Sequence, residues 1–220
     1  MQLKEWAPLY QKIIEEFGYD ESSDENSARL LKALMMNSNL VTEDEIHIQK
    51  TVTIFGNSGS LKKDITQMKP RGTLIASGSS VEKLTELNIL PDIVVTDLDG
   101  EIRKQIEASR KGALTFIHAH GDNSELIQRY AQEFTGPVVL TTQSRPDNLI
   151  SNYGGFTDGD RAVCIARHFG AKEILLLGFD FKEPSSKEGS DSMVKLKKLR
   201  WAEKIIFDHN EQGVQIIMPR

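Results

Sequence analysis

Two aspartates separated by one residue, Asp97 and Asp99, are the residues of this sequence whose placement first indicates chemistry. They follow a short run of β-branched residues, Ile93–Val95, which is typical of a buried strand. Two carboxylates released together at the end of such a strand need a positive partner, because unpaired buried charge is costly. A magnesium ion that carries phosphate oxygens meets this need, since Mg²⁺ usually takes one or two protein carboxylates.

The alternative interpretation of Asp97 and Asp99 is structural. Aspartate side chains commonly accept hydrogen bonds from the backbone of their own turn and cap the helix that follows. An isolated Asp-x-Asp pattern favours this alternative, because short motifs often match by chance. The other polar clusters along the chain move the interpretation toward metal and phosphate chemistry.

A glycine- and serine-rich turn follows the apolar run Val52–Phe55 and precedes a predicted helix. Small residues in such a turn let backbone N–H groups approach a phosphate. The turn matches neither a GxGxxG fingerprint nor a P-loop, so an ordinary tight turn is the alternative. Gly78 lies in a similar turn, in which Ser79 and Glu82 form a capping box. The residues of the first turn are Gly56, Asn57, Ser58, Gly59 and Ser60.

Two histidines, His118 and His120, end another predicted strand and are followed by Asp122 and Asn123. Alternate strand positions face the same way, so both imidazoles are expected on one side. A zinc site is disfavoured, because no third ligand has suitable spacing. We expect imidazole contacts to phosphate or to a substrate ring, and a buried structural histidine is the alternative for at least one of the two.

A fourth polar cluster, Gly155–Ala162, precedes an apolar helical pattern. Thr157 and Asp160 fit a capping pattern, which leaves Asp158 and Arg161 without a structural explanation. A bound ligand would explain both residues: a phosphate beside Arg161, or a flat apolar ligand beside Phe156.

From Thr51 onward, short apolar runs alternate with helical patterns. This alternation predicts an α/β fold, a Rossmann-like, mainly parallel sheet with helices on both faces. Ligands of such sheets bind beyond the carboxyl ends of the strands, where the polar clusters that follow Phe55, Val95 and Ile117 fall. The predicted strands are Val52–Phe55, Leu74–Ala76, Ile93–Val95, Leu114–Ile117, Pro137–Thr141, Ile174–Leu177 and Val214–Met218.

Residues 1–50 differ from the rest and are predicted as a small helical N-terminal element, with residues 51–220 as the α/β catalytic domain. The helices of the N-terminal element are expected over Leu3–Phe17 and Ser27–Asn37, and this element is expected to have little chemistry of its own. The polar segment Lys182–Asp191 is predicted to be a surface loop that could act as a lid. In the predicted helix Met193–Asp208, we expect a solvated basic face, formed by Lys195, Lys197, Lys198 and Arg200.

The composition bounds the class of protein. A hydrophobic content of 39%, a charged content of 27% and a net charge of −5 are ordinary for a soluble globular protein and disfavour a nucleic-acid partner. No apolar run is long enough for a membrane span and no signal-peptide pattern is seen, so a cytoplasmic protein without a membrane partner is expected. The single cysteine, Cys164, excludes an internal disulfide and is predicted to pack in the core.

Three of the motifs together resemble a known family. The motifs PDIVVTDLDG, HAHGDN and GFTDGDRA are similar, in this order and spacing, to the archaeal 6-hydroxymethyl-7,8-dihydropterin pyrophosphokinases of the MptE type, a family related in fold to thiamin pyrophosphokinases. The resemblance covers the chain from about Thr51 to its C-terminus. The turn GNSGSL lacks the proline of the corresponding family turn, and Ser77 stands where such proteins usually have an aspartate.

The resemblance implies an enzyme that transfers diphosphate from ATP to 6-hydroxymethyl-7,8-dihydropterin and releases AMP, in pterin biosynthesis of the tetrahydromethanopterin or folate type. It implies Mg²⁺ bound by Asp97, Asp99 and Asp160. The expected catalytic residues are Asp97, Asp99, His118, His120 and Asp122. Nucleotide and pterin contacts are expected from Gly56, Asn57, Ser58, Gly59, Ser60, Gly78, Asn123, Phe156, Thr157, Asp158 and Arg161.

Three alternatives stay open at this point. A thiamin pyrophosphokinase-like enzyme would share the metal and the nucleotide, and a glycosyl-transfer protein of the same broader family would use a nucleotide sugar. A non-catalytic module would bind ATP without releasing AMP. The expected partners are ATP and a reduced pterin alcohol, and a homodimer is also considered.

Overall fold

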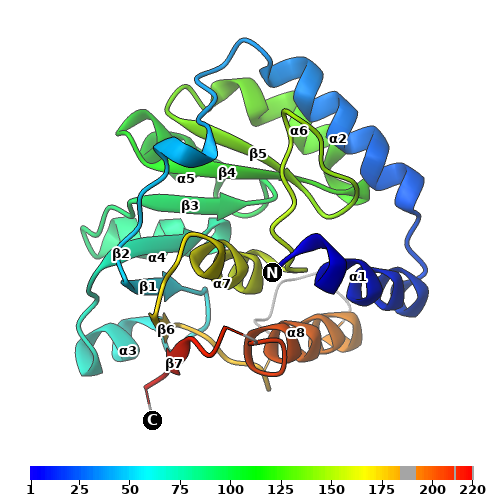
Figure 1. Cartoon of the computed structure of the whole chain (residues 1–220). Coiled ribbons are helices and arrows are strands. Elements are labelled where there is room, and N and C mark those ends of the chain that lie inside the picture. The colour runs from blue at the N-terminus through cyan, green and yellow to red at the C-terminus, as the bar shows by residue number, and fades with distance from the viewer. Residues whose placement is uncertain (184–191, 211, 220) are drawn as a thin grey trace.

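Seven parallel strands form one sheet at the centre of the molecule (Figure 1). The computed structural model describes residues 1–183, 192–210 and 212–219. In this part of the chain the strand order is β5-β4-β3-β2-β1-β6-β7, and every neighbouring pair is parallel. The strands are β1 (Thr51–Phe55), β2 (Thr73–Ser77), β3 (Ile93–Thr96), β4 (Leu114–Ala119), β5 (Val138–Thr142), β6 (Glu173–Leu177) and β7 (Gln215–Ile217).

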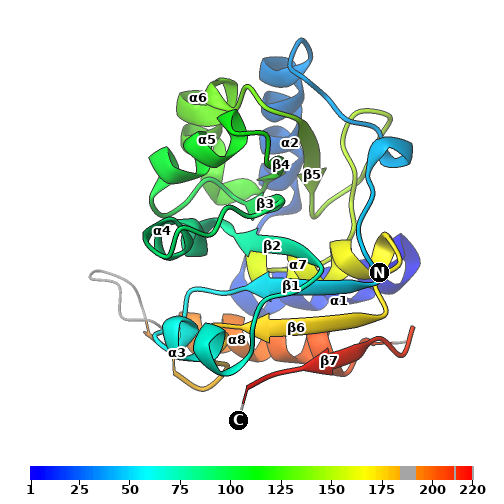
Figure 2. The ribbon, with the colours of Figure 1, turned by 90° about the vertical axis from the view of Figure 1, so that its left-hand side faces the viewer.

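Helices cover both faces of the sheet, as the sequence predicts (Figures 1 and 2). On one face α7 packs against the strands, and α1 and α8 pack against α7. The other face is covered by α3, α4, α5 and α6, with α2 beside β4 and β5. The helices are α1 (Leu3–Phe17), α2 (Glu21–Met35), α3 (Leu61–Gln67), α4 (Val81–Glu86), α5 (Ile102–Arg110), α6 (Ser124–Tyr130), α7 (Asp158–His168) and α8 (Ser192–Phe207).

Successive strand residues point to opposite faces, and this alternation builds two cores. In β3, Ile93 and Val95 belong to the core under α7, whereas Val94 belongs to the core under α3 and α4. Both faces are apolar because a parallel sheet buries both. The polar residues are therefore displaced to the ends of the strands, where the site lies.

The second helix begins earlier than the sequence predicts. The periodicity indicates Ser27–Asn37, whereas α2 spans Glu21–Met35. Asp20 is the reason, because its side chain accepts a hydrogen bond from the Ser22 backbone N–H and caps the helix. The polar residues after Asp20 are thus helical, and they bring the start of α2 to the carboxyl end of the sheet.

The N-terminal helices pack on the α/β part of the chain. Trp6 of α1 donates a hydrogen bond from its ring Nε1 to the Gln143 carbonyl, just beyond β5. Leu40 forms an isolated parallel bridge with Val138 of β5. None of the described helices has the length and apolar character that crossing a bilayer requires. The predicted lid, Lys182–Asp191, falls largely on residues 184–191, which lie outside the described residues, and stays a prediction.

Candidate active site

A pocket of about 510 Å³ lies at the carboxyl ends of the strands. The segments that follow β1 through β6 contribute to its lining, together with the α1–α2 connection, the first turn of α7 and the first half of α8. Its volume is in the usual range for pockets that bind small molecules and cofactors.

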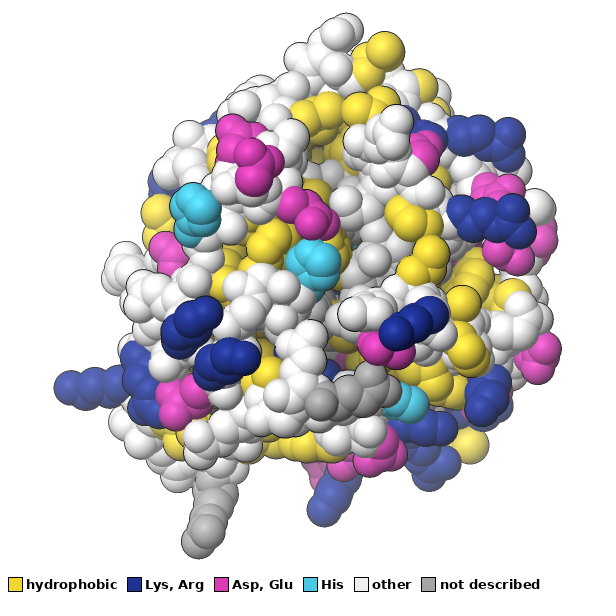
Figure 3. All heavy atoms as spheres, in the orientation of Figure 1, with side chains coloured by type: hydrophobic (Ala, Val, Ile, Leu, Met, Phe, Trp, Pro, Cys, Tyr) yellow, Lys and Arg dark blue, Asp and Glu magenta, His cyan; other side chains and the backbone are white. Residues whose placement is uncertain are grey.

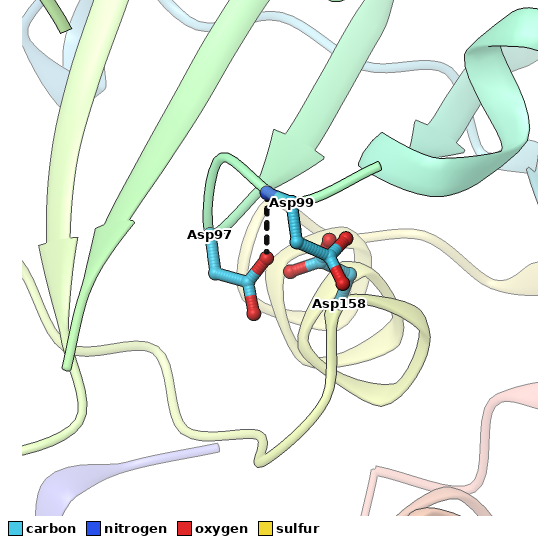
Figure 4. Close-up of side chains that lie close together, drawn as sticks. All are labelled: Asp97, Asp99 and Asp158. Carbon is cyan, nitrogen blue, oxygen red and sulfur yellow. Dashed lines mark hydrogen bonds between the residues drawn. The ribbon is translucent and has the colours of Figure 1, made fainter. Parts of the chain in front are cut away.

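Three carboxylates converge in this pocket (Figure 4). Asp97 and Asp99 come from the turn after β3, and Asp158 is the first residue of α7. One oxygen from each lies within 4.8 Å of the others, which is a spacing that a single metal ion can bridge. Carboxylate oxygens are the ligands preferred by hard divalent cations such as Mg²⁺, so the donor set fits that ion.

The turn that carries Asp97 and Asp99 has a left-handed residue between them. Leu98 has a φ of +69° and its side chain is buried in the core with α2 and α5. This conformation costs a non-glycine residue about 1 kcal/mol or more. Buried Gln105 of α5 supports the turn by donating a hydrogen bond to the Asp99 carbonyl, 2.6 Å away. Backbone strain that surrounding contacts enforce is frequent at functional sites.

Asp97 is held ionised by its neighbours. His120 Nε2 lies 3.4 Å from Asp97 Oδ2, and the Asp99 backbone N–H donates to Asp97 Oδ1. Burial alone would raise the pKa of the Asp97 carboxyl, but the hydrogen bond from His120 and the charge of Arg161 lower it below its ordinary value. A carboxylate at this position is therefore available to a cation.

Asp158 has the opposite electrostatic situation. Its burial and the nearby Asp97 charge raise the pKa of the Asp158 carboxyl well above its ordinary value. Arg161, which is itself buried, donates from Nη1 to Asp158 Oδ1 at 2.9 Å and opposes this rise. Asp97 and Asp158 thus repel each other, and a divalent cation between them would relieve that repulsion.

Asp160 does not belong to this cluster, although the family resemblance implies it as a metal ligand. Its carboxylate accepts hydrogen bonds from the backbone N–H groups of Phe156 and Thr157, both at 2.7 Å, and from the Thr157 hydroxyl. This is the capping box that the sequence indicates for Thr157 and Asp160. The structure places Asp158, and not Asp160, beside Asp97 and Asp99.

The two histidines occupy different environments. His120 lines the pocket, whereas His118 is buried beneath it, and its Nδ1 lies 3.0 Å from Thr141 Oγ1. Burial, with the charge of Arg161, lowers the pKa of the His118 imidazole well below its ordinary value. His118 therefore matches the structural alternative.

The turn that holds His120 is organised by Asn123. Asn123 does not line the pocket, and its amide donates to the carbonyls of Asp97 and His118, thereby joining the ends of β3 and β4. His120 Nδ1 accepts a hydrogen bond from the Asp122 backbone N–H at 3.3 Å, so its Nε2 carries the proton that faces Asp97. Asp122 lines the pocket and is exposed.

Only part of the predicted phosphate turn reaches the pocket. Gly56, Asn57 and Ser58 line it. A Cβ on Gly56 would lie 2.4 Å from the Gly178 carbonyl oxygen, so this close approach of the turns after β1 and β6 requires glycine. Gly59 does not line the pocket, and Ser60 turns away from it and donates to Asp64.

Gly78, in the second small-residue turn, has a packing role. A Cβ there would lie 2.5 Å from Thr96 Oγ1, whereas its neighbours Ser77 and Ser79 line the pocket.

The sequence analysis missed the contribution of the N-terminal element. Asp24 of α2 lines the pocket although it is only 2% exposed. Its carboxylate accepts from the Gly121 backbone N–H at 2.6 Å, from Gln143 Nε2 at 2.8 Å and from the Tyr10 hydroxyl at 2.5 Å. The polar run after Asp20 contained this residue, but nothing in its spacing indicated the strand ends as its partner.

An aromatic group forms another wall of the pocket. Phe156 and Tyr19 line it, and Phe17, the last residue of α1, packs against both, with its ring centroid 5.2 Å from that of Phe156 and 5.4 Å from that of Tyr19. Phe179, after β6, lines the pocket on another side. Phe156 is largely buried in this wall, and its predicted contact with a flat ligand stays a prediction.

Two lysines of α8 also line the pocket, Lys195 and Lys198, where the sequence predicts a solvated basic face. Charged side chains of both signs are interspersed on the face shown in Figure 3, and the described residues there form no broad basic area.

Comparison with known proteins places this architecture in a family. A model of the MptE-like 6-hydroxymethylpterin diphosphokinases matches residues 25–186. A 6-hydroxymethyl-7,8-dihydropterin pyrophosphokinase of Pyrococcus furiosus is 40% identical over 219 residues, which are 94% of this chain and 93% of the relative. The enzyme of the same name from Methanocaldococcus jannaschii is 36% identical over 228 residues, 94% of this chain and 95% of that relative.

A solved structure shares the fold. The MAf glycosyltransferase of Magnetospirillum magneticum AMB-1 superposes with a TM-score of 0.57 at 14% identity, over 91% of this chain and 37% of that one. At this identity the likeness concerns the fold alone.

Proposed function

The chain belongs to the MptE-like family of 6-hydroxymethylpterin diphosphokinases, and from that premise we propose that it transfers diphosphate to 6-hydroxymethyl-7,8-dihydropterin. The observation that carries the proposal to this chain is the convergence of Asp97, Asp99 and Asp158 in a pocket at the strand ends. Diphosphoryl transfer needs little covalent work from a protein and depends on positioning and charge neutralisation. The pocket supplies groups for both.

We further propose ATP as the donor. The hydroxymethyl oxygen of the pterin attacks the β-phosphorus of ATP. The bond from that phosphorus to the oxygen shared with the α-phosphorus breaks, and AMP leaves with this oxygen. The backbone N–H of Asn57 would hold a phosphate oxygen, whereas the N–H groups of Gly56 and Ser58 already donate to the carbonyls of Leu177 and Gly178.

Magnesium would bind to Asp97, Asp99 and Asp158, where it would neutralise the charge of the phosphate oxygens. His120 directs its Nε2 at Asp97 and keeps that carboxylate in place. Because the Nδ1 lone pair of His120 accepts the Asp122 N–H, we assign the acceptance of the hydroxyl proton to the Asp122 carboxylate in the pocket.

The direct test is incubation of the purified protein with ATP, Mg²⁺ and the reduced pterin alcohol, with separation of the nucleotides. We expect AMP and the pterin diphosphate in equal amounts. Formation of ADP would contradict the diphosphoryl transfer. Turnover of thiamin instead of the pterin, or binding of a nucleotide sugar in place of ATP, would favour one of the alternative activities.

Asp97→Asn separates catalysis from capping. It should abolish AMP formation with a melting temperature close to that of the wild type, because asparagine retains an oxygen for the Asp99 N–H. A large fall in melting temperature would indicate that Asp97 serves mainly to stabilise its turn.

A further inference from the structure

The first half of α8 has an unusual distribution of side chains. Met193 and Val194 are exposed, at 64% and 38%, whereas Lys195 and Lys198 are half-buried and line the pocket. An amphipathic helix normally directs its apolar side chains inward and its lysines to solvent. Places where a sequence breaks such a local rule are often functional.

Lys195 and Lys198 are three residues apart, so they lie on the same side of the helix. Among the described residues that line the pocket, these two lysines are the ones with a basic aliphatic side chain. Aspartate and glutamate side chains outnumber them there. The ammonium group of Lys198 lies over the rings of Phe156, at 5.6 Å from the centroid, and Tyr19, at 5.9 Å. These rings hold the cation at the pocket wall.

Lys198 forms no salt bridge within the described part of the chain. By contrast, its neighbour Lys197 does not line the pocket, and its Nζ lies 3.7 Å from Glu16 Oε1. Ring faces attract a cation but supply no hydrogen-bond acceptor, so the three donors of the Lys198 ammonium group remain available to an anion.

We propose that Lys198 binds the polyphosphate of the nucleotide, with Lys195 one turn before it as a second contact. This assignment rests on the proposed function and makes it more specific. A triphosphate beside three carboxylates has an excess of negative charge that one divalent cation does not cancel. A lysine on the α8 wall supplies further positive charge as a point charge on a flexible stem.

The experiment compares Lys198→Met with Lys197→Met, two neighbouring substitutions that remove the same charge, the first from a side chain that lines the pocket and the second from one that does not. Binding of ATP with Mg²⁺, and of AMP, is measured by calorimetry, and KM is measured for ATP and for the pterin. For Lys198→Met we expect ATP affinity to fall about tenfold to a hundredfold, the range for losing a charged hydrogen bond. AMP affinity and the KM for the pterin should stay unchanged, and Lys198→Arg should recover part of the ATP affinity.

Lys197→Met should bind ATP like the wild type, and both variants should keep the wild-type melting temperature. If wild-type protein forms AMP and Lys198→Met binds ATP as tightly as Lys197→Met does, the assignment of Lys198 is overturned and the proposed function stands. A raised KM for the pterin alone would overturn it too. If the wild type forms no AMP, the proposed function fails, and the ATP-binding comparison still decides the role of Lys198. Wild-type protein that binds no ATP would overturn both.

Discussion

The first turn of α7 and the end of β4 each carry a pair of like residues two positions apart, and in each pair one member faces the pocket. Asp158 joins the carboxylate cluster, while Asp160 is enclosed in its own turn. His120 faces Asp97, while His118 is buried against Thr141. Residue type alone therefore does not separate a site residue from a structural one.

Geometry separates the two pairs in different ways. Positions two apart on a helix point to nearly opposite sides, so one aspartate turns toward the strand ends and the other toward the backbone that precedes α7. Positions two apart on a strand share a side, so the histidines differ in depth: His118 lies within β4, and His120 lies past its end. Backbone and hydroxyl donors satisfy Asp160, whereas His118 is buried with its Nδ1 beside Thr141 Oγ1.

The largest effect is expected from a substitution at Asp158, the member of the α7 pair that faces the pocket. Asp158→Asn should lower the kcat for AMP formation by at least about a hundredfold, because it removes a proposed metal ligand. Asp160→Asn should leave kcat within a few-fold of wild type when measured well below its melting temperature. Equal losses of kcat in the two variants would contradict the division between Asp158 and Asp160.

Stability should show the reverse order. Asp160→Asn should lower the free energy of unfolding by about 2–3 kcal/mol. The NH₂ group that replaces one carboxylate oxygen is a donor, so a backbone N–H that faces it loses its acceptor. Urea denaturation at neutral pH measures this difference, with Asp99→Asn as the control at an exposed carboxylate of the cluster. A control that is destabilised as much as Asp160→Asn would refute the capping role.

The histidine pair predicts a pH dependence of stability. Folded His118 stays neutral because its pKa is lowered, whereas the unfolded chain protonates this histidine near its ordinary pKa. The free energy of unfolding should therefore fall as pH drops below about 6.5, by at most about 1.4 kcal/mol per pH unit from this residue. His118→Asn should flatten the slope between pH 6.5 and 5, and a slope identical to wild type would exclude His118 as its source.

The smallest expected effect is on stability: Mg²⁺ binding in the absence of substrate should distinguish Asp158 from Asp160. Millimolar Mg²⁺ should stabilise the wild-type protein by about 1 kcal/mol through binding to the folded state alone. Thermal unfolding with and without MgCl₂ measures this, and Asp158→Asn should lose the response. Asp160→Asn, corrected for its lower melting temperature, should keep it.

The fold was predictable because it depends on local patterns. The β-branched runs indicate the strands and the alternation with helices indicates a parallel sheet, so the strand-end position of Asp97 and Asp99 follows. The capping box at Thr157 already indicated a structural Asp160, and only the family resemblance assigned it to a metal.

The parts that sequence could not supply depend on tertiary packing. Asp24 reaches the pocket because α2 packs beside β4 and β5, and no spacing in residues 1–50 encodes that contact. Lys195 and Lys198 reach the pocket because α8 forms part of its wall, although their helical pattern alone favours solvent.

The hydrogen bond from Gly121 to Asp24 limits how far the chain can be shortened. A polypeptide that starts at Glu25 retains every position matched by the family model, yet it lacks the acceptor that Gly121 and Gln143 share. Such a fragment would keep all seven strands of the sheet, but the segment bearing His120 would lose its anchor. The segment matched by the family model is thus shorter than the segment that a complete site requires.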